Sequence, residues 1–314
     1  MRSMHHIIST REYTTEMFDD ILELAEKLEP VAKGEVKSEI MDGKVLALLF
    51  FEPSTRTRMS FEAAMLRLGG QVLNMGSIEA SSIAKGESLA DTIRVTSQYA
   101  DAVVLRHPRE GAALMASECS SSPIINGGDG AGHHPTQTLL DLYTIKRESK
   151  LENLNIALAG DLKYGRTIHS LCYALSRYHA RINLVSPPEL RLPDRIVDDL
   201  LKRNIDVNIT DNMEDVIEDI DVLYMTRIQK ERFPDPAEFN RISNSMRITK
   251  ELIHSAKPEM KIMHPLPRVN EISFEVDNTP HAAYFKQAFY GIPVRMAILC
   301  KVLGVEDKIK EEGM

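Results

Sequence analysis

The sequence contains no tryptophan and few cysteines, and it has no long apolar run. Cys119, Cys172 and Cys300 are odd in number and far apart, so they fit a reducing cytoplasm better than a disulfide framework. The longest apolar run spans residues 45–51, far short of the ~20 residues that a membrane span requires. The first residues lack the apolar core and cleavage site of a signal peptide. We therefore expect a cytoplasmic protein without a membrane partner.

The sequence has no excess of positive charge. It contains 38 lysine and arginine residues and 46 acidic residues, which gives a net charge of −8. This balance argues against nucleic acid as the main partner. A hydrophobic fraction of 43% and a charged fraction of 27% are typical of a globular chain and exclude disorder. At roughly 150 residues per domain, the length of 314 residues predicts two domains.

Several catalytic motifs are also missing. The sequence has no His-Glu-x-x-His or Cys-x-x-Cys motif and no closely spaced carboxylate cluster, so we expect neither a metal nor a cofactor. It lacks a Gly-x-Ser-x-Gly motif, and no cysteine lies in a reactive context. Any chemistry should therefore depend on positioning and electrostatics rather than on a covalent intermediate.

Short apolar runs alternate with helical patterns along the chain. Strands are predicted at 44–51, 71–75, 102–105, 123–126, 155–159, 181–185, 207–209, 222–226 and 261–263, and helices at 54–68, 88–99, 110–118, 136–146, 167–179, 194–203 and 281–303. This alternation predicts an α/β fold with two doubly wound parallel-sheet domains joined by helices. We place one domain at 1–135 plus 290–314 and the other at 136–289, with the C-terminal helix returning to the first domain.

Arginines follow four of the predicted strands. In open parallel sheets, ligands bind beyond the carboxyl ends of the strands. Arg56, Arg106, Arg166 and Arg227 come just after strand ends in a chain that is acidic overall. This pattern indicates a site for anions.

The segment from Ser54 to Arg58 is the sharpest of these signals. A Pro-Ser turn opens a helix after a buried strand, so free backbone N–H groups and the positive end of the helix dipole face the ligand. Thr55 and Thr57 add hydroxyl groups, and Arg56 and Arg58 add guanidinium forks. This combination predicts a phosphate site. If Ser54 were merely a helix cap, that would explain one hydroxyl but not the two arginines.

Residues 160–167 nearly match a phosphate-binding P-loop, but Arg166 stands where the lysine belongs. The guanidinium group of arginine is a planar fork that matches a carboxylate, whereas the ammonium group of lysine is a point charge. We therefore interpret Arg166 as a carboxylate-binding residue rather than as part of a nucleotide-hydrolysing P-loop.

Two other segments carry polar side chains. His134 and Gln137 are three residues apart at a helix start, so both can face one ligand. Residues 81–87 form a polar stretch between a predicted strand and a predicted helix, and this position alone predicts a solvated loop. The histidines expected to be structural are His5, His6, His107, His169 and His281.

These motifs together resemble the aspartate/ornithine carbamoyltransferase family. The segments that carry the resemblance are Phe51–Arg58, Lys85–Glu87, Arg106–Pro108, His134–Gln137, Gly160–Arg166, Met225–Arg232 and His264–Arg268. The likeness runs through nearly the whole chain, and the segments at 161–166 and 264–268 favour aspartate over ornithine as the acceptor. The resemblance implies transfer of the carbamoyl group of carbamoyl phosphate to the amine of L-aspartate in de novo pyrimidine biosynthesis, giving N-carbamoyl-L-aspartate and phosphate.

The resemblance also implies roles for individual residues, with carbamoyl phosphate bound by the first domain and L-aspartate by the second. The phosphate would be held by Ser54, Thr55, Arg56, Thr57 and Arg106, and the carbamoyl oxygen polarised by Arg56, Thr57 and His134. The carbamoyl amide or the attacking amine would donate to Gln137 and to the carbonyl groups of Leu266 and Pro267. The carboxylates of aspartate would be bound by Arg166, Arg227 and Gln229.

The resemblance further implies an obligate homotrimer with shared active sites. Ser81 and Lys85 would come from a neighbouring subunit, and Lys85 would be both catalytic and aspartate-binding. Members of the family occur as bare trimers and as larger assemblies with regulatory chains, so the sequence leaves a regulatory partner open. Three other interpretations also stay open: a carbamoyltransferase with another amino-acid acceptor, a non-catalytic protein that binds phosphorylated metabolites, and a P-loop hydrolase.

Overall fold

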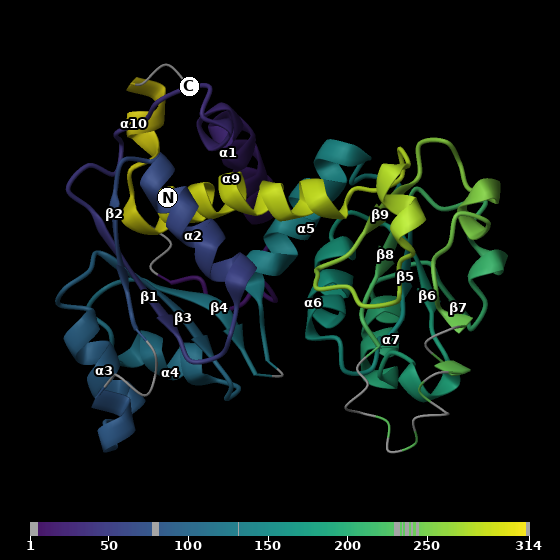
Figure 1. Cartoon of the computed structure of the whole chain (residues 1–314), viewed down its shortest axis with the longest axis horizontal. Helices are drawn as coiled ribbons and strands as arrows, with labels where there is room; N and C mark the ends of the chain where they lie inside the picture. The colour runs from purple at the N-terminus through teal and green to yellow at the C-terminus, as the bar shows by residue number, and fades with distance from the viewer. Residues whose placement is uncertain are drawn as a thin grey trace. The chain divides into compact units, whose positions relative to one another are not determined.

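The structure is a computed structural model that describes residues 6–76, 82–130, 132–228, 233, 235, 239, 241–242 and 245–311 (Figure 1). The chain divides into two compact units, the first made of residues 1–140 and 289–314 and the second of residues 141–288. Both boundaries fall inside helices, α5 (Pro135–Glu148) and α9 (Tyr284–Leu303), so continuous helices connect the units. No helix in the described ranges is long and apolar enough to cross a membrane.

The first unit contains a parallel sheet in the order β2-β1-β3-β4. Its strands are β1 (Val45–Phe50), β2 (Gln71–Asn74), β3 (Ala102–His107) and β4 (Ile124–Asp129). The chain goes from β1 to β2 on one side and then to β3 on the other. The carboxyl ends of β1 and β3 therefore flank the point where the strand order reverses, which is where ligands bind in such sheets.

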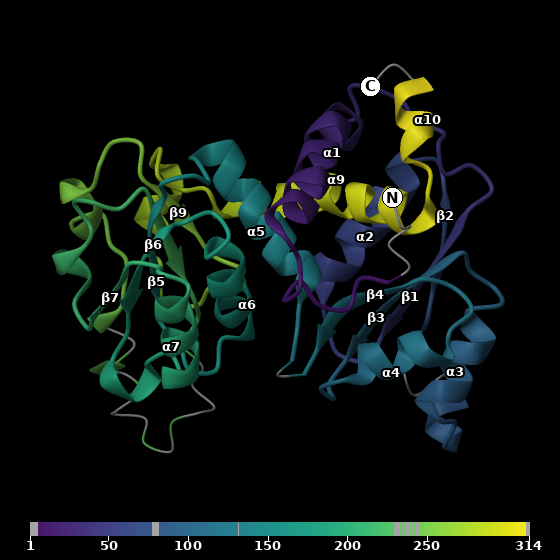
Figure 2. The ribbon, with the colours of Figure 1, turned by 180° about the vertical axis from the view of Figure 1, so that it is seen from behind.

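Helices cover both faces of this sheet. They are α1 (Thr15–Lys33), α2 (Thr55–Arg67), α3 (Leu89–Thr96), α4 (Ala112–Cys119), α9 and α10 (Glu306–Glu311). Figures 1 and 2 show α1, α2 and α9 on one side and α3 and α4 on the other. Leu49 of β1 and Leu105 of β3 belong to one buried cluster with Ile93 of α3 and Ala116 of α4. Because both faces are covered, the strands are continuous apolar runs.

The second unit contains a parallel sheet in the order β7-β6-β5-β8-β9. The strands are β5 (Asn155–Ala159), β6 (Arg181–Val185), β7 (Val207–Thr210), β8 (Val222–Met225) and β9 (Lys261–Met263). Helices α6 (Arg166–Leu175) and α7 (Asp194–Lys202) lie on one side of it in Figure 2. A second core contains Ala157 and Leu223 of the sheet together with Met246 and Ile272. Here the strand order reverses between β5 and β8.

Short 3₁₀ helices complete the described structure: η2 (Ser82–Lys85), η3 (Pro188–Leu190), η4 (Met213–Asp215), η6 (Leu252–Ser255) and η7 (Phe274–Asn278). The predicted fold class is confirmed, with two parallel α/β sheets and a final helix that returns to the first unit. Helix α1 was not predicted. Its signals are Thr14, whose side chain accepts from the Met17 N–H, and buried apolar residues at helical spacing.

The prediction for β4 was wrong at its C-terminal end, because the strand continues through Asp129 instead of stopping at Asn126. Gly127 and Gly128, which the prediction left outside the strand, are part of it. A Cβ atom on Gly127 would lie 3.2 Å from Cγ1 of Val104 on β3, so glycine permits close packing here. The Gly127 carbonyl oxygen also accepts a hydrogen bond from Arg106 Nη1 at 3.0 Å.

Candidate active site

The segment after β1 starts α2 at the reversal point of the first sheet. The Phe51 N–H donates to the Arg106 carbonyl oxygen at 2.8 Å, which fixes the segment against the end of β3. Ser54 occupies the N-cap position, yet its hydroxyl makes no cap hydrogen bond, and the first turn of α2 has no acidic residue. Ser54 is therefore not a simple helix cap. The backbone N–H groups at this helix start can therefore donate hydrogen bonds to an anion.

Two arginines lie on the first turn of α2. The side chains of Arg56 and Arg58 are exposed and form no ion pair with any residue that the structure describes. Desolvation by nearby protein lowers the pKa of Arg56, although an arginine stays cationic at neutral pH. Thr57 is buried beside them. Two cations with no carboxylate partner in the described ranges, at the start of a helix, are suited to bind an anion.

Arg106 is held on two sides at the end of β3. Its Nη1 donates to the Gly127 carbonyl oxygen at 3.0 Å, and its Nη2 lies 3.4 Å from Oε2 of Glu52. The side chain is only 16% exposed. Sequence analysis gave Glu52 no role, because nothing local links it to an arginine on another strand.

A buried carboxylate shapes the loop between β4 and α5. Asp129 Oδ1 accepts from the His133 N–H at 2.7 Å and from Asn126 Nδ2 at 3.1 Å. Its Oδ2 accepts from the Gly111 N–H at 2.9 Å. Asn126 also donates to the Ile8 carbonyl oxygen at 3.0 Å. Asn126 and Asp129 were not predicted as site residues, yet they set the course of the chain into α5.

His134 and Gln137 share the start of α5, as their spacing predicts. The Gln137 N–H donates to the His134 carbonyl oxygen at 2.9 Å, and His134 Nδ1 lies 3.4 Å from Thr136 Oγ1. Both side chains are buried. An imidazole and a carboxamide are thus carried on one turn of the first unit.

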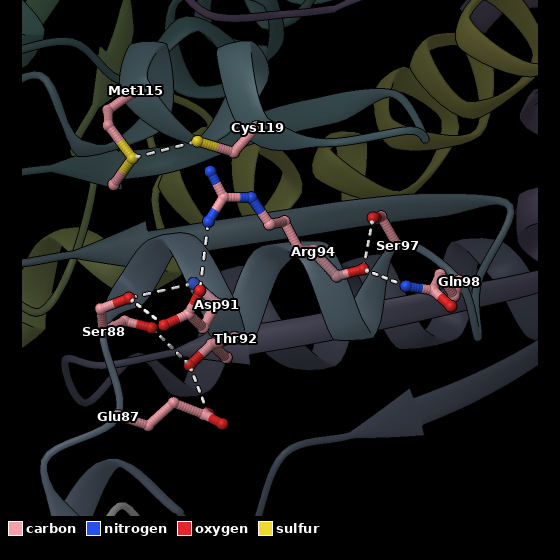
Figure 3. Close-up of polar contacts among 9 residues, drawn as sticks. All are labelled: Glu87, Ser88, Asp91, Thr92, Arg94, Ser97, Gln98, Met115 and Cys119. Atoms are coloured by element: carbon pink, nitrogen blue, oxygen red, sulfur yellow. Dashed lines mark hydrogen bonds and ion pairs between the residues drawn. The ribbon is translucent and has the colours of Figure 1, made fainter.

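Lys85 ends η2, and its side chain is exposed. The segment after it is anchored to α3 (Figure 3). Ser88 Oγ accepts from the Asp91 N–H at 3.1 Å, and Thr92 Oγ1 donates to Glu87 Oε2 at 2.8 Å. Ser81, the other residue assigned to a neighbouring subunit, lies outside the described residues.

In the second unit, Arg166 and Arg227 follow adjacent strands at the reversal point. Arg166 begins α6 after β5, and Arg227 follows β8, whose Met225 pairs with Ala159 of β5. Gly160 has a φ of +102°, and a Cβ atom there would lie 2.4 Å from the Thr226 carbonyl oxygen. The first glycine of the P-loop-like pattern is therefore required by strand packing.

The side chain of Arg227 is partly exposed and has no ion-pair partner within the described ranges. It is available for an acidic ligand beside the start of α6. Gln229, predicted to bind the same ligand, lies outside the described residues.

The segment 264–268 follows β9. The Leu266 N–H donates to His264 Nδ1 at 2.8 Å, Leu266 has a φ of 51°, and the Leu266–Pro267 peptide is cis. Arg268 is an ion-pair partner of Asp277, and its guanidinium lies over the rings of Tyr284 at 5.2 Å and Phe274 at 4.8 Å. Arg268 is thus occupied by structural contacts.

Four of the histidines expected to be structural bond to the backbone. His6 Nδ1 accepts from the Ile124 N–H at 3.0 Å, and His281 Nδ1 lies 2.8 Å from the Met260 carbonyl oxygen. His107 Nδ1 accepts from the Arg109 N–H at 3.0 Å, and His169 Nε2 lies 2.9 Å from the Leu162 carbonyl oxygen. Burial lowers the pKa of both. In the part of the chain that the structure describes, no group of three His, Cys, Asp or Glu side chains could hold a metal ion.

Comparison with known proteins agrees with this arrangement. Residues 5–147 match the aspartate/ornithine carbamoyltransferase carbamoyl-P binding domain, and residues 152–302 match the Asp/Orn binding domain of the same family. The aspartate carbamoyltransferase catalytic subunit of Methanococcoides burtonii is 66% identical over 299 residues, covering 95% of this chain and 97% of that protein.

Solved structures of the same family are also similar to this chain. The catalytic subunit of M. jannaschii aspartate transcarbamoylase has a TM-score of 0.92 at 55% identity, over 96% of this chain and 98% of that one. Aspartate transcarbamoylase from Trypanosoma cruzi, solved with N-(phosphonacetyl)-L-aspartic acid, has a TM-score of 0.88 at 42% identity, over 95% of both chains. The chain therefore belongs to the aspartate/ornithine carbamoyltransferase family, and it is a carbamoyltransferase.

Proposed function

We propose that the protein transfers the carbamoyl group of carbamoyl phosphate to the amine of L-aspartate, giving N-carbamoyl-L-aspartate and phosphate, in de novo pyrimidine biosynthesis. The observation that carries this proposal is the helix start at the end of β1, where Arg56 and Arg58 have no ion-pair partner among the described residues. Aspartate is favoured over ornithine because Arg227 offers a cation, which suits a second carboxylate and repels an ammonium group. The T. cruzi relative has been solved with both carbamoyl phosphate and aspartate.

In this proposal, the first unit binds carbamoyl phosphate. The phosphate oxygens accept from Ser54, Thr55, Arg56, Thr57 and Arg106. Arg56, Thr57 and His134 polarise the carbamoyl oxygen. The amide of the carbamoyl group, or the attacking amine, donates to Gln137 and to the carbonyl oxygens of Leu266 and Pro267. The second unit binds the aspartate carboxylates through Arg166, Arg227 and Gln229.

The chemistry follows from these donors. The aspartate amine attacks the carbonyl carbon, and the carbonyl oxygen gains negative charge as the tetrahedral intermediate forms. Donors that are already in place stabilise this charge without reorganising. The intermediate collapses by breaking the bond from carbon to the phosphate oxygen, and the leaving phosphate takes the proton of the amine. No carboxylate base is needed.

The direct test is to supply carbamoyl phosphate with either aspartate or ornithine and to measure the ureido product. We expect product with aspartate alone. Product with ornithine alone would overturn the assignment of the second unit while leaving the phosphate site intact. No product with either acceptor would favour a binding protein and contradict the proposal.

The proposal includes a cytoplasmic homotrimer in which Ser81 and Lys85 complete the site of a neighbouring subunit. Lys85 is exposed and has no ion-pair partner among the described residues of its own chain. Large apolar side chains are exposed on α2, on the edge strand β2 and around α3, namely Met59, Leu66, Leu73, Val95 and Tyr99. Such exposure is typical of a surface that another subunit covers.

Shared sites predict complementation between two inactive variants. Chains carrying Lys85→Ala and chains carrying Arg56→Ala should each be inactive alone. After dissociation and reassembly together, some sites combine an intact Lys85 with an intact Arg56, so activity should return. A mixture as inactive as its parents would contradict the shared site.

A further inference from the structure

A chain of buried polar side chains in the second unit leads to the segment 264–268. Tyr224 Oη donates to Asp141 Oδ2 at 2.8 Å, and Gln287 Nε2 donates to Asp141 Oδ1 at 2.7 Å. Gln287 Oε1 in turn accepts from the His264 N–H at 2.8 Å. Each of these four residues is at most 2% exposed. The backbone at His264 is therefore fixed from the interior.

The ring of His264 is fixed as well. Its Nδ1 accepts from the Leu266 N–H at 2.8 Å, so in the neutral ring the proton is on Nε2. Nε2 lies 3.6 Å from Oε1 of Glu271, which is 5% exposed. Glu271 Oε2 accepts from the N–H groups of Val269 at 2.6 Å and Asn270 at 2.8 Å. Glu271 thus lies between the histidine ring and the far end of the segment, and its contact with the ring is electrostatic, because no hydrogen bond joins Oε1 to Nε2.

The charge state of Glu271 supports this arrangement. Burial raises its pKa, but the contact with His264 and the backbone N–H groups outweigh burial and hold the pKa below the ordinary value. Glu271 is therefore an anion facing the Nε2–H of His264 at neutral pH.

Burying the carboxylates of Asp141 and Glu271 costs desolvation free energy, so stability alone does not account for these contacts. What a buried polar network provides is one defined geometry. Leu266 needs such support, because a φ of 51° is unfavourable for a residue with a branched side chain. The hydrogen bond from its own N–H to His264 holds it there.

We propose that His264 is a positioning residue for carbamoyl transfer: by accepting the Leu266 N–H, it fixes the peptide plane that leads into Leu266 and so helps to place the Leu266 carbonyl oxygen. Gln287 and Glu271 hold His264 in place for this task. The inference rests on the proposed function, which assigns the Leu266 carbonyl oxygen to the carbamoyl amide or the attacking amine.

The test compares His264→Leu, which removes the acceptor at similar size, with His264→Asn, which can place an oxygen near the former Nδ1. We expect kcat for N-carbamoyl-L-aspartate formation to fall about tenfold or more in His264→Leu and to recover largely in His264→Asn. Binding of inorganic phosphate, which probes the first unit, should be unchanged in both. The matched control is His281→Leu, since His281 Nδ1 lies 2.8 Å from the Met260 carbonyl oxygen in the same unit. It should lose stability but keep kcat.

A wild-type kcat in His264→Leu would overturn this inference alone, and so would an equal kcat loss in His264→Leu and His281→Leu. Absence of product from the wild-type protein would overturn the proposed function and this inference together. If His264→Leu does not fold, Glu271→Gln replaces it, because glutamine keeps an acceptor for Val269 and Asn270 but removes the charge facing Nε2. A severalfold lower kcat with unchanged phosphate binding is expected, and a wild-type kcat would again overturn the inference.

Discussion

Arg106 and Glu52 lie side by side at the reversal point of the first sheet, with 3.4 Å between Nη2 and Oε2. Arg106 also donates to the Gly127 carbonyl oxygen at 3.0 Å, so its guanidinium is oriented before any ligand arrives. A donor that is already in place loses little conformational freedom on binding phosphate. The separation from Glu52 exceeds that of a good charged hydrogen bond.

We expect Arg106→Ala to weaken binding of carbamoyl phosphate and inorganic phosphate by roughly 10- to 100-fold, the equivalent of about 1.5–3 kcal/mol for a charged hydrogen bond. Isothermal titration with phosphate measures this loss. Glu52→Gln is the matched control, because it removes the negative charge beside Arg106 but no phosphate donor, and it should bind phosphate at least as well as the wild type. Unchanged affinity in Arg106→Ala would remove Arg106 from the phosphate site.

We expect Arg227 to contribute to the affinity for aspartate and not to the affinity for carbamoyl phosphate. Arg227→Ala is predicted to raise KM for aspartate about tenfold or more, because a charged hydrogen bond to a carboxylate is lost, while KM for carbamoyl phosphate stays within about twofold. The control is Arg181→Ala, at the amino end of β6, where Arg181 makes an exposed ion pair with Asp206. A rise in both KM values, or the same rise in the control, would contradict the assignment.

The contact of Arg268 with Asp277 predicts how stability depends on pH. Hydrogen bonding to Arg268 holds the pKa of Asp277 below its ordinary value. The Asp277 carboxylate therefore binds a proton more readily in the unfolded chain than in the folded one. Its contribution to stability is complete above pH ~4 and declines as pH falls through the lowered folded-state pKa.

Asp277→Asn should therefore lose about 1.5–3 kcal/mol of unfolding free energy at pH 7 and progressively less below pH ~4. Unfolding in urea between pH 7 and pH 3 tests this trend. A difference between variant and wild type that does not shrink in acid would show that Asp277 acts through packing rather than charge.

Much of the site could be predicted because its signals are local. Ser54–Arg58, Arg166 and Arg227 follow apolar strand runs directly, and parallel sheets gather such positions at one edge. The partners of these residues could not be predicted. Glu52 reaches an arginine on another strand, and Asp129 binds N–H groups from two separate segments, so both depend on tertiary packing.

The errors in the fold have similar causes. Gly127 was left outside the predicted strand because glycine is rare inside strands, but its place beside Val104 of β3 leaves little room for a side chain. The cis peptide before Pro267 and the positive φ of Leu266 have no sequence signal of their own. Both features occur where the Leu266 N–H donates a hydrogen bond to His264, and only the folded structure reveals that hydrogen bond.

The central claim is that donors at the start of α2 stabilise the charge that develops on the carbamoyl oxygen, with Arg56 foremost. The most direct measurement is kcat for N-carbamoyl-L-aspartate formation in Arg56→Ala, with Arg58→Ala as the neighbouring arginine for comparison. Loss of Arg56 is predicted to remove ~3 kcal/mol or more of transition-state stabilisation, so kcat should fall by two orders of magnitude or more. An unchanged turnover in Arg56→Ala would contradict the account.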